Sequence, residues 1–388
     1  MPCVQSAGPA VSVQTLRATF EVAQVLRQHW AEVENHPQIN RWQLRTLSAL
    51  RRCRTADLGG HVDACSECGT VRISYNSCRN RHCPKCQGKN RESWLADRES
   101  ELLPVPYFHV VFTLPDTLNP LAMYHPKAVY DSLFEAAWLT VICFAKDPKH
   151  LGAKAGMIAI LHTWGQTLML HPHLHCIVPG GGLTKDGKWK TAKTQGKYLF
   201  PVKAMSKVFR AKYVKALKSR IEPDKELINQ LFQKEWVVYA KRPFGHPKAV
   251  LEYLGRYTHK VAISNHRILD IDSQKTTFSY KDYRQGAQKL EMSLDNLEFI
   301  RRFSMHILPK GLVRIRHFGI LGSSAKQITI PLIHQELGIP VPEKEIRILE
   351  SYNPRYCPCC QKESMISIQR LPKRGPPKAV FSSVPTQF

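Results

Sequence analysis

Two closely spaced pairs of cysteines constrain the fold of this chain more than any other feature. Cys65 and Cys68 form one pair with two residues between them, and Cys83 and Cys86 form a second pair further along. So short and basic a segment lacks a hydrophobic core, and a zinc ion that takes two thiolates from each turn can replace that core. We therefore expect these four cysteines to hold one structural Zn²⁺ in a small zinc-ribbon-like domain.

The same segment contains other potential zinc ligands, and a further cysteine cluster lies near the C-terminus. The additional ligands are Cys53, His61, Cys78 and His82. They could form a second zinc site, and for the two cysteines the alternative is packing in a small core. Cys357 and Cys360 supply only half of a tetrahedral site. Because no partner pair is near them in the sequence, we expect no metal there.

The charge of the chain favours a polyanionic partner. Lysine and arginine number 56, and aspartate and glutamate number 31, in 388 residues, so the net charge is +25. Such an excess indicates nucleic acid as the partner, and the alternative is a protein that is merely basic. The N-terminus lacks the pattern of a signal peptide, and no run of about 18 apolar residues occurs. We therefore expect no membrane span and a reducing cytoplasm as the location.

Helix and strand patterns alternate along the chain and indicate an α+β fold. Helical periodicity covers residues 15–50, 117–146 and part of 185–220. Strand patterns occupy 107–114, 157–164, 173–178, 236–240, 261–264, 267–271, 276–280 and 312–318. Several of these strands are close enough in sequence to form hairpins, so we expect one antiparallel sheet with helices packed on a face.

Three histidines lie close together in the segment His171-Pro-His173-Leu-His175. On a strand, alternate side chains point to the same face, so His173 and His175 can bind one metal ion together. A divalent ion needs a third ligand, and the candidates are Gln166, His162 and His171. Three histidines in five positions are hard to explain by core packing alone.

Two tyrosines lie farther along the chain in a helical pattern. Tyr253 and Tyr257 are four residues apart, which places both phenols on one helix face, and Lys260 follows one turn after Tyr257. A phenol has an ordinary pKa of about 10, so its use as a nucleophile requires a metal ion or a cation such as Lys260 to stabilise the phenolate. Taken alone, the tyrosines could be core aromatic residues. Together with the histidines and the positive charge, they indicate metal-assisted cleavage of a nucleic-acid backbone.

Basic residues gather in two places that we expect to contact phosphates. One surrounds the second cysteine pair, and the other is an amphipathic helix within 185–220, a region with twelve lysines and arginines and one acidic residue. The candidates for DNA binding are Arg79, Arg81, Lys85, Lys89, Arg91, Lys203, Lys207 and Arg210. The alternative for this set is an ordinary solvated surface.

These motifs resemble those of HUH endonucleases, and their order along the chain resembles that of the two-tyrosine transposases of the IS91 family. His173-Leu-His175 is similar to the His-hydrophobic-His motif, Tyr257-Thr-His-Lys260 to the Tyr-x-x-Lys motif of rolling-circle initiators, and Phe112-Thr-Leu-Pro115 to the first-strand motif. The cysteine pairs, His162-Thr-Trp-Gly-Gln166 and Tyr253-Leu-Gly-Arg-Tyr257 complete the likeness, which spans roughly residues 40–320.

The resemblance implies an HUH nuclease core, in which an antiparallel sheet presents the metal site and a tyrosine helix lies opposite. It implies that His173 and His175 bind Mg²⁺ or Mn²⁺, that Tyr253 and Tyr257 are nucleophiles, and that Lys260 supports them. The implied activity is that of a bacterial insertion-sequence transposase located at the nucleoid. Such an enzyme cleaves and rejoins single-stranded DNA at element ends and target through a 5′-phosphotyrosine link, in rolling-circle-like transposition.

On this basis we expect four parts. Residues 1–50 form a helical N-terminal segment, 51–100 the zinc-binding domain, 105–320 the catalytic domain, and 321–388 a C-terminal appendage with a disordered tail. The alternatives are a rolling-circle replication initiator with the same chemistry, and a non-catalytic zinc-dependent DNA-binding regulator in which the histidines and tyrosines are structural. The completeness of the motifs argues against a decayed, inactive element protein.

Overall fold

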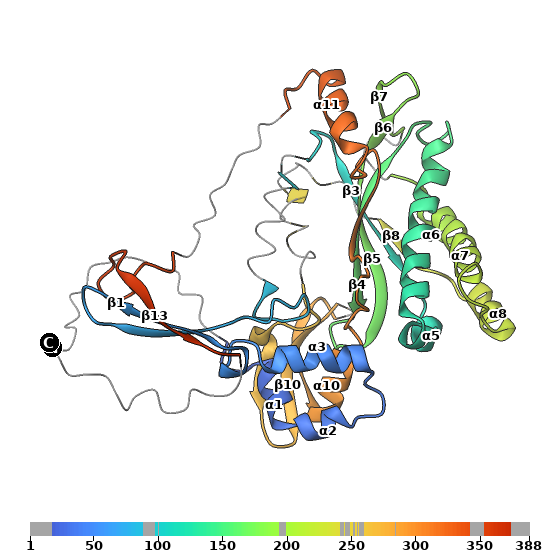
Figure 1. Cartoon of the computed structure of the whole chain (residues 1–388). Coiled ribbons are helices and arrows are strands. Elements are labelled where there is room, and N and C mark those ends of the chain that lie inside the picture. Colours follow the sequence, from blue (N-terminus) through green and yellow to red (C-terminus); the bar gives the residue numbers. More distant parts are fainter. Residues whose placement is uncertain are drawn as a thin grey trace.

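The computed structural model of the chain describes residues 18–87, 98, 99, 101–193, 199–240, 244, 249, 250, 253, 255, 260–283, 285–341 and 353–373. Figure 1 shows a central sheet backed by helices, a second group of helices with its own small sheet, and a third, separate sheet. The mixture of helices and antiparallel strands confirms the expected α+β class.

The central sheet has the strand order β12-β4-β5-β3-β8, and all neighbouring strands in it are antiparallel. Its strands are β3 (Tyr107–Thr113), β4 (Gly156–Trp164), β5 (Leu170–Pro179), β8 (Val238–Ala240) and β12 (Ile315–Gly319). Strand alternation sends side chains to two faces. Phe112, Leu161 and Leu174 point into one buried core. The residues next to each of them along its strand point to the opposite face.

Helices cover the first of these faces (Figure 1). They are α5 (Asn119–Tyr124), α6 (Pro126–Lys146), α7 (Val202–Lys218) and α8 (Lys225–Gln233), joined to β3 by the short helix η2 (Asp116–Leu118). Of the helices that the structure describes, α6 alone is long and apolar enough to cross a membrane, with a mean hydropathy of 1.4. Of the most apolar 18-residue stretch of α6, 61% is buried. The packing of α6 against α7 and the sheet accounts for its composition. A two-stranded sheet of β6 (Gly181–Leu183) and β7 (Trp189–Thr191) follows β5.

The second group joins N-terminal helices to a segment far along the chain. Its elements are α1 (Val22–Gln28), α2 (Trp30–Glu34), α3 (Arg41–Arg51), η3 (Asn265–Arg267), β9 (Ile268–Ile271), β10 (Lys275–Asp282), β11 (Gln288–Asp295) and α10 (Asn296–Ser304). Asn40 and Gln43 form a capping box that begins α3. The buried Gln43 side chain also donates to the Ser304 carbonyl oxygen at 2.9 Å, which fastens α3 to α10. The N-terminal helices are therefore part of a shared core with residues 262–307.

One expected strand is wrong, because residues 261–264 form bends instead. Their apolar side chains Ala262 and Ile263 are buried in the shared core, so tertiary packing explains the pattern that resembled a strand.

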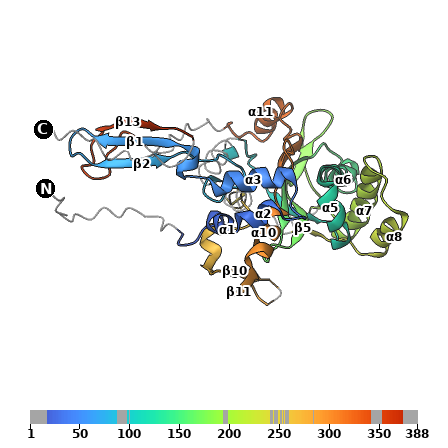
Figure 2. The same cartoon turned by 60° about the horizontal axis from the view of Figure 1, so that its bottom comes forward.

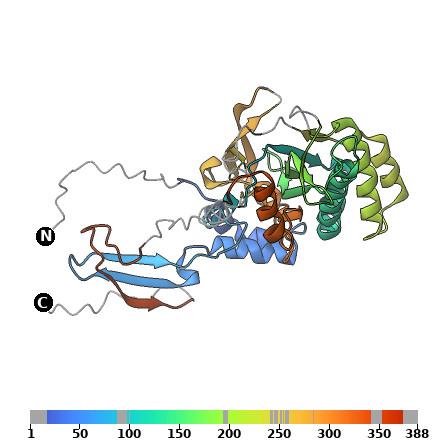
Figure 3. The ribbon, with the colours of Figure 1, turned by 90° about the horizontal axis from the view of Figure 1, so that it is seen from above.

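The third group is a sheet with the order β13-β1-β2 (Figures 2 and 3). It consists of β1 (Gly60–Cys65), which follows η1 (Ala56–Leu58), β2 (Val71–Tyr75) and β13 (Met365–Leu371). β1 is the middle strand and pairs antiparallel with both others. Residues 321–388 are therefore not a simple appendage, since part of them completes this sheet and α11 (Lys326–Glu336) packs against the central sheet through Ile330 and Ile333. Residues 374–388, within the expected tail, lie outside the described residues.

Candidate metal centre and nucleic-acid pocket

Three histidines from two paired strands meet on the face of the central sheet opposite α6 and α7. His162 of β4 pairs with His173 of β5 in the ladder, and His175 lies two residues farther along β5 on the same face. One nitrogen from each ring lies within 4.8 Å of the others, and His173 Nε2 is 3.1 Å from His175 Nε2. Three imidazole nitrogens at this spacing can hold a divalent ion and leave positions for water or a phosphate oxygen.

Of the three candidates for a third ligand, the structure brings His162 to the pair. Gln166 lies in the turn after β4, where its backbone oxygen accepts from the Arg267 guanidinium at 2.6 Å and its side-chain oxygen accepts from the Lys281 backbone N–H at 3.5 Å. His171 contributes its carbonyl oxygen to the group rather than its ring, as an acceptor for His173 Nδ1 at 2.6 Å. Only the cross-strand register distinguishes His162 from the other two.

Burial and hydrogen bonds keep the ring nitrogens in the form that binds metal. Burial lowers the pKa of His173 to about 4, and it also lowers the pKa of His175. Both rings are therefore neutral at pH 7, as a metal ligand must be. Because a carbonyl oxygen only accepts, His173 Nδ1 carries the proton and its Nε2 lone pair points into the group. His175 Nδ1 in turn lies 3.0 Å from Nε2 of His109, and a partner on the second nitrogen fixes ring orientation.

Tyr253 reaches the histidines from the facing segment of the chain. Its hydroxyl oxygen is 2.6 Å from His109 Nε2 and 3.3 Å from His175 Nδ1, and its ring packs against those of His109 and Phe244. His109 is 4% exposed, and sequence reasoning did not single it out. Its position in the expected strand 107–114, beside the strand of the histidine pair, is the signal that could have identified it.

Of the other two residues of the expected catalytic set, the structure describes one. Tyr257 lies outside the described residues. Lys260 is exposed and lines a pocket next to the histidines, so it can meet a strand bound there.

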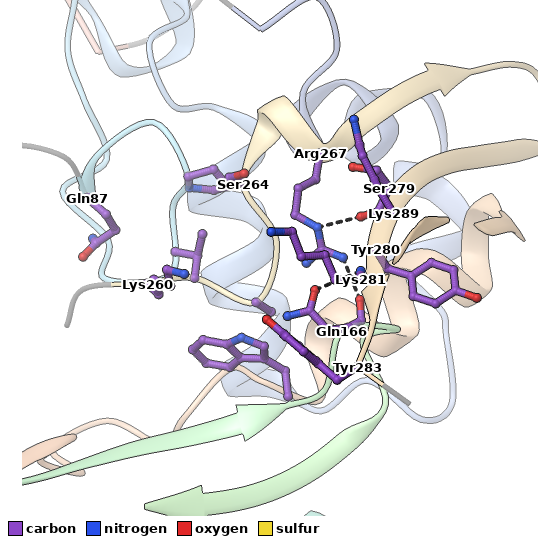
Figure 4. A pocket seen from close by; sticks show the side chains of 14 residues that line it. Gln87, Gln166, Lys260, Ser264, Arg267, Ser279, Tyr280, Lys281, Tyr283 and Lys289 are labelled. Carbon is purple, nitrogen blue, oxygen red and sulfur yellow. Dashed lines mark hydrogen bonds between the residues drawn. The ribbon is translucent and has the colours of Figure 1, made fainter. Parts of the chain in front are cut away.

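This basic pocket has a volume of about 480 Å³ (Figure 4). Trp164 connects it to the histidines, because its ring stacks on His162 with 4.7 Å between centroids and also lines the pocket. The cationic lining residues are Lys260, Arg267, Lys281 and Lys289, and the aromatic ones are Trp164, Tyr280 and Tyr283. None of the described residues that line it is acidic. Cations interleaved with aromatic rings are the composition of a surface that binds single-stranded nucleic acid.

Two of these cations oppose each other across a strand pair. Lys281 of β10 and Lys289 of β11 are direct partners in the ladder, and both are exposed. Like charges directly opposite on antiparallel strands destabilise a sheet, so this pair is typical of a site for an anion. Arg267 has a different role, because its guanidinium donates to the carbonyl oxygens of Ser279 and Gln166 and so ties β10 to the turn after β4.

The four cysteines expected to hold one zinc do not come together. Cys83 and Cys86 instead join Cys53 and Cys78, with all four Sγ atoms within 4.8 Å of one another. Cys86 Sγ lies 3.6 Å from Cys53 Sγ and 3.8 Å from Cys78 Sγ. This four-thiol group lies at the end of α3, in the core that the N-terminal helices share with β10 and α10.

The other expected pair, Cys65 and Cys68, meets Cys357 and Cys360 in a second four-thiol group. We expected no metal at the two C-terminal cysteines because no partner pair is near them in the sequence. The fold brings a pair that is distant in sequence beside them. The β1–β2 hairpin explains the division, because it carries the turn after Cys65 away from Cys53 by five strand steps of about 3.3 Å, or roughly 17 Å.

Neither histidine of the expected second zinc site joins a thiol group. His61 Nε2 lies 3.4 Å from an Asp63 carboxylate oxygen. His82 Nε2 accepts from the Leu308 backbone N–H at 3.3 Å, and burial lowers the pKa of His82 to about 3. Of the expected set Cys53, His61, Cys78 and His82, the structure brings the two cysteines together, with Cys83 and Cys86 in place of the two histidines.

Several cations expected to bind DNA are engaged within the fold. Arg81 donates to backbone carbonyl oxygens of residues 308–312, and Arg210 donates to those at the end of α8. Lys85 pairs with Glu21 at 2.9 Å. The exposed members of the set are Arg79, Lys203 and Lys207. The two lysines lie on α7, across the central sheet from the histidines, and Lys89 and Arg91 lie outside the described residues.

Two parts of the chain match families of known proteins. Residues 156–328 match the family described as "Putative transposase", and residues 25–114 match that described as "Transposase zinc-binding domain". The chain is 42% identical to "Putative transposase y4qJ" of Sinorhizobium fredii over 392 residues, which covers 93% of this chain and 98% of that protein. It is 28% identical over 359 residues to "Transposase for insertion sequence element IS801" of Pseudomonas savastanoi pv. phaseolicola, covering 88% and 84%. No solved structure matches the chain.

Proposed function

This chain belongs to the IS91-type family of insertion-sequence transposases, and from that premise we propose that it cleaves and rejoins single-stranded DNA with Tyr253 as a nucleophile. His162, His173 and His175 would hold the divalent cation. The observation that carries the proposal is the Tyr253 hydroxyl, 3.3 Å from His175 Nδ1, so that the phenol lies against the outer nitrogen of the ring whose Nε2 faces His173. Within the described residues no carboxylate belongs to that group, so it does not resemble an acidic triad.

The donor set discriminates between the two ions expected from the sequence. Mg²⁺ prefers oxygen ligands, whereas imidazole nitrogens suit first-row transition ions. The three histidines therefore favour Mn²⁺ over Mg²⁺. When bound, the cation supplies Lewis-acid polarisation of a phosphate oxygen.

The chain's own residues supply the nucleophile and its alignment. The Tyr253 hydroxyl oxygen attacks phosphorus, and the bond from phosphorus to the 3′ oxygen of the preceding nucleotide breaks. The phenol proton leaves along the 2.6 Å hydrogen bond to His109 Nε2, and the departing 3′ oxygen takes up a proton from water. The products are a 5′-phosphotyrosine and a free 3′-hydroxyl. When a 3′-hydroxyl attacks the same phosphorus, the bond from phosphorus to the Tyr253 oxygen breaks, the phenol takes back its proton from His109, and the attacking hydroxyl gives its proton to water. The phosphodiester is restored and the strands are rejoined.

Tyr257 is the second nucleophile in this proposal. Its position four residues after Tyr253 gives one phenol for each of two successive cleavages, if the helical spacing of the sequence holds.

The basic pocket supports single-stranded DNA as the substrate. Because Trp164 contacts both His162 and the pocket, a nucleotide in the pocket would adjoin a scissile phosphate at the histidines. Its base can stack on Tyr283, which is 69% exposed, and its phosphate can meet the pair Lys281 and Lys289. Stacking of this kind accepts any base and requires that the base be unpaired.

The zinc of the family's zinc-binding domain fits the group of Cys53, Cys78, Cys83 and Cys86. A tetrahedral ion with Zn–S bonds of about 2.3 Å has sulfur atoms about 3.8 Å apart, and the measured separations are 3.6 and 3.8 Å. With four thiolates the site leaves no open position, so this zinc is structural. It would hold the end of α3 to the loop that carries Arg79 and Arg81.

Covalent trapping tests the proposed function. The full chain is incubated with Mn²⁺ and labelled single-stranded oligonucleotides from the element ends, and adducts are resolved on a denaturing gel. We expect a metal-dependent adduct with the wild type and its loss in Tyr253→Phe combined with Tyr257→Phe. Tyr124→Phe is the matched control, because Tyr124 is 81% exposed on α5, and it should trap as the wild type does.

Two outcomes separate the alternatives. Tight DNA binding without any adduct would overturn the proposal in favour of a zinc-dependent regulator. An adduct that persists in the double variant would exclude both tyrosines as nucleophiles. Joining of the trapped strand to a second oligonucleotide distinguishes a transposase from an enzyme that only nicks its DNA.

A further inference from the structure

The second four-thiol group is formed by residues from opposite ends of the chain. Cys65 Sγ lies 3.6 Å from Cys360 Sγ, and Cys68 Sγ lies 3.7 Å from Cys357 Sγ. All four sulfur atoms are within 4.8 Å of one another. These separations are too long for a disulfide, whose sulfur atoms are about 2.0 Å apart. They match the edge of about 3.8 Å expected for sulfur around tetrahedral zinc.

The two halves of this group have the same local geometry. In each half two cysteines are separated by two residues, and the residue after the second cysteine donates its N–H to the carbonyl oxygen of the first. These bonds run from Gly69 to Cys65 at 3.1 Å and from Gln361 to Cys357 at 3.0 Å. Both donors have positive φ, at 69° and 58°. The repeated turn aims two thiols at one point from each side.

Hydroxyl groups also surround the thiols. Ser364 Oγ lies 3.0 Å from Cys65 Sγ, and Thr70 Oγ1 lies 3.1 Å from Cys68 Sγ. Hydrogen bonds from such groups stabilise thiolate over thiol. Outer hydrogen bonds of this kind typically support metal ligands.

The surrounding sheet has too little core to hold β13 by apolar packing. Among the residues that the structure describes, the buried cluster beside it consists of Cys65, Cys357 and Met365, with Cys360 packed against it. The apolar side chains of the outer strands are largely exposed, as with Ile366 at 56% and Val71 at 57%. Modules with so small a core usually need a metal to fold.

We propose that Cys65, Cys68, Cys357 and Cys360 bind a second structural Zn²⁺, which clasps the C-terminal strand β13 to the N-terminal zinc-binding domain. The family match for that domain ends at residue 114 and so contains only half of these ligands. The site is independent of the tyrosine chemistry, and each could fail without the other.

Thiol footprinting of the wild-type chain tests the proposal without a folding artefact. The protein is treated with N-ethylmaleimide before and after zinc removal with a strong chelator, digested, and analysed by mass spectrometry. Cys359 and Cys68 are both exposed, but only Cys68 belongs to the thiol group. We expect Cys359 to react at once and Cys68 to react only after chelation. Equal reaction of the two before chelation would overturn the proposal.

Zinc content gives a second, quantitative readout. It is measured by elemental analysis in a His173→Ala and His175→Ala background, so that the histidine group adds no ion. We expect two zinc ions per chain, one in Cys357→Ser combined with Cys360→Ser, and two in the neighbouring control Cys359→Ser. One ion in the background protein, or two in the double serine variant, would overturn the proposal. If the double serine variant unfolds and loses both ions, Cys360→His is made instead, with Cys357 kept. This variant again has four ligands and should bind two zinc ions.

Discussion

The opposed lysines of the pocket yield a prediction in which stability and DNA binding change in opposite directions. Lys281 and Lys289 are direct partners on β10 and β11, so their like charges repel in the free protein, and a bound anion would neutralise them. We predict that Lys281→Gln combined with Lys289→Gln makes the free protein more stable and weakens its binding to single-stranded DNA. A lysine pair on an ordinary solvated surface would show the first effect without the second.

The magnitudes follow from the two contacts. A directly opposed like-charge pair costs about 0.2–1 kcal/mol, so its removal should raise the free energy of unfolding by that amount. For single strands, each phosphate contact contributes about 0.7 to the slope of log affinity against log salt. Loss of two contacts should therefore reduce the slope by about 1.4. Between 50 and 200 mM salt the wild type should lose about sevenfold more affinity than the variant.

Fluorescence anisotropy with a short labelled oligonucleotide measures the slope, and urea denaturation measures the stability. The control is Lys203→Gln combined with Lys207→Gln, which removes the same charge from exposed positions on α7, across the sheet from the histidines. We expect its slope for the short oligonucleotide to stay close to that of the wild type. An unchanged slope in the pocket variant, or an equal change in both variants, would refute the assignment of the phosphate site to the pocket.

Two further predictions concern the histidine group and the α10 ion pairs. His162→Ala should weaken Mn²⁺ binding, measured by calorimetry, by at least about 100-fold, since even residues behind a ligand contribute 10–100-fold; Gln166→Ala should leave it nearly unchanged, and the reverse order would restore Gln166 as the ligand. Arg301 and Arg302 lower the pKa of Glu298 to about 2 in the folded protein, below its value of about 4.5 in the unfolded chain. The ion pairs therefore stabilise the fold fully at a pH above about 4.5, and this contribution is lost as the pH falls toward 2. Glu298→Gln should therefore lower the free energy of unfolding by about 1 kcal/mol or less at pH 7, and a difference that persists undiminished at pH 3 in urea titrations would contradict the linkage.

The strands of the central sheet were predictable because their signals are local. β3, β4 and β5 lie within a residue or a few of the expected ranges, since β-branched and aromatic residues dominate them. β11 was missed although Leu290, Met292 and Leu294 alternate with polar residues along it and are half-buried, a pattern typical of a strand with one packed face. β13 was missed because its apolar residues mark no buried face, since the five side chains between Met365 and Leu371 are all exposed.

The site was predictable where ligands are neighbours in sequence and not where they meet through pairing. His173 and His175 follow from strand alternation alone. His162 depends on the register of β4 with β5, which pairs it with His173, and no local pattern reports that register. The predicted grouping of the cysteines was wrong for a similar reason, because Cys65 meets Cys360, which is 295 residues away in the sequence.

The place of β13 in the fold has a consequence for synthesis of the protein. β1 ends at Cys65, and its outer partner β13 begins at Met365, some three hundred residues later. At about 5–20 residues per second, a bacterial ribosome needs roughly 15–60 s to make that interval. During this time β1 has one free edge, and the turn after it carries only two of the four thiols of its group. The module closes only on a chain translated to its last strand, so a prematurely stopped copy of the element would release a protein whose N-terminal module stays open.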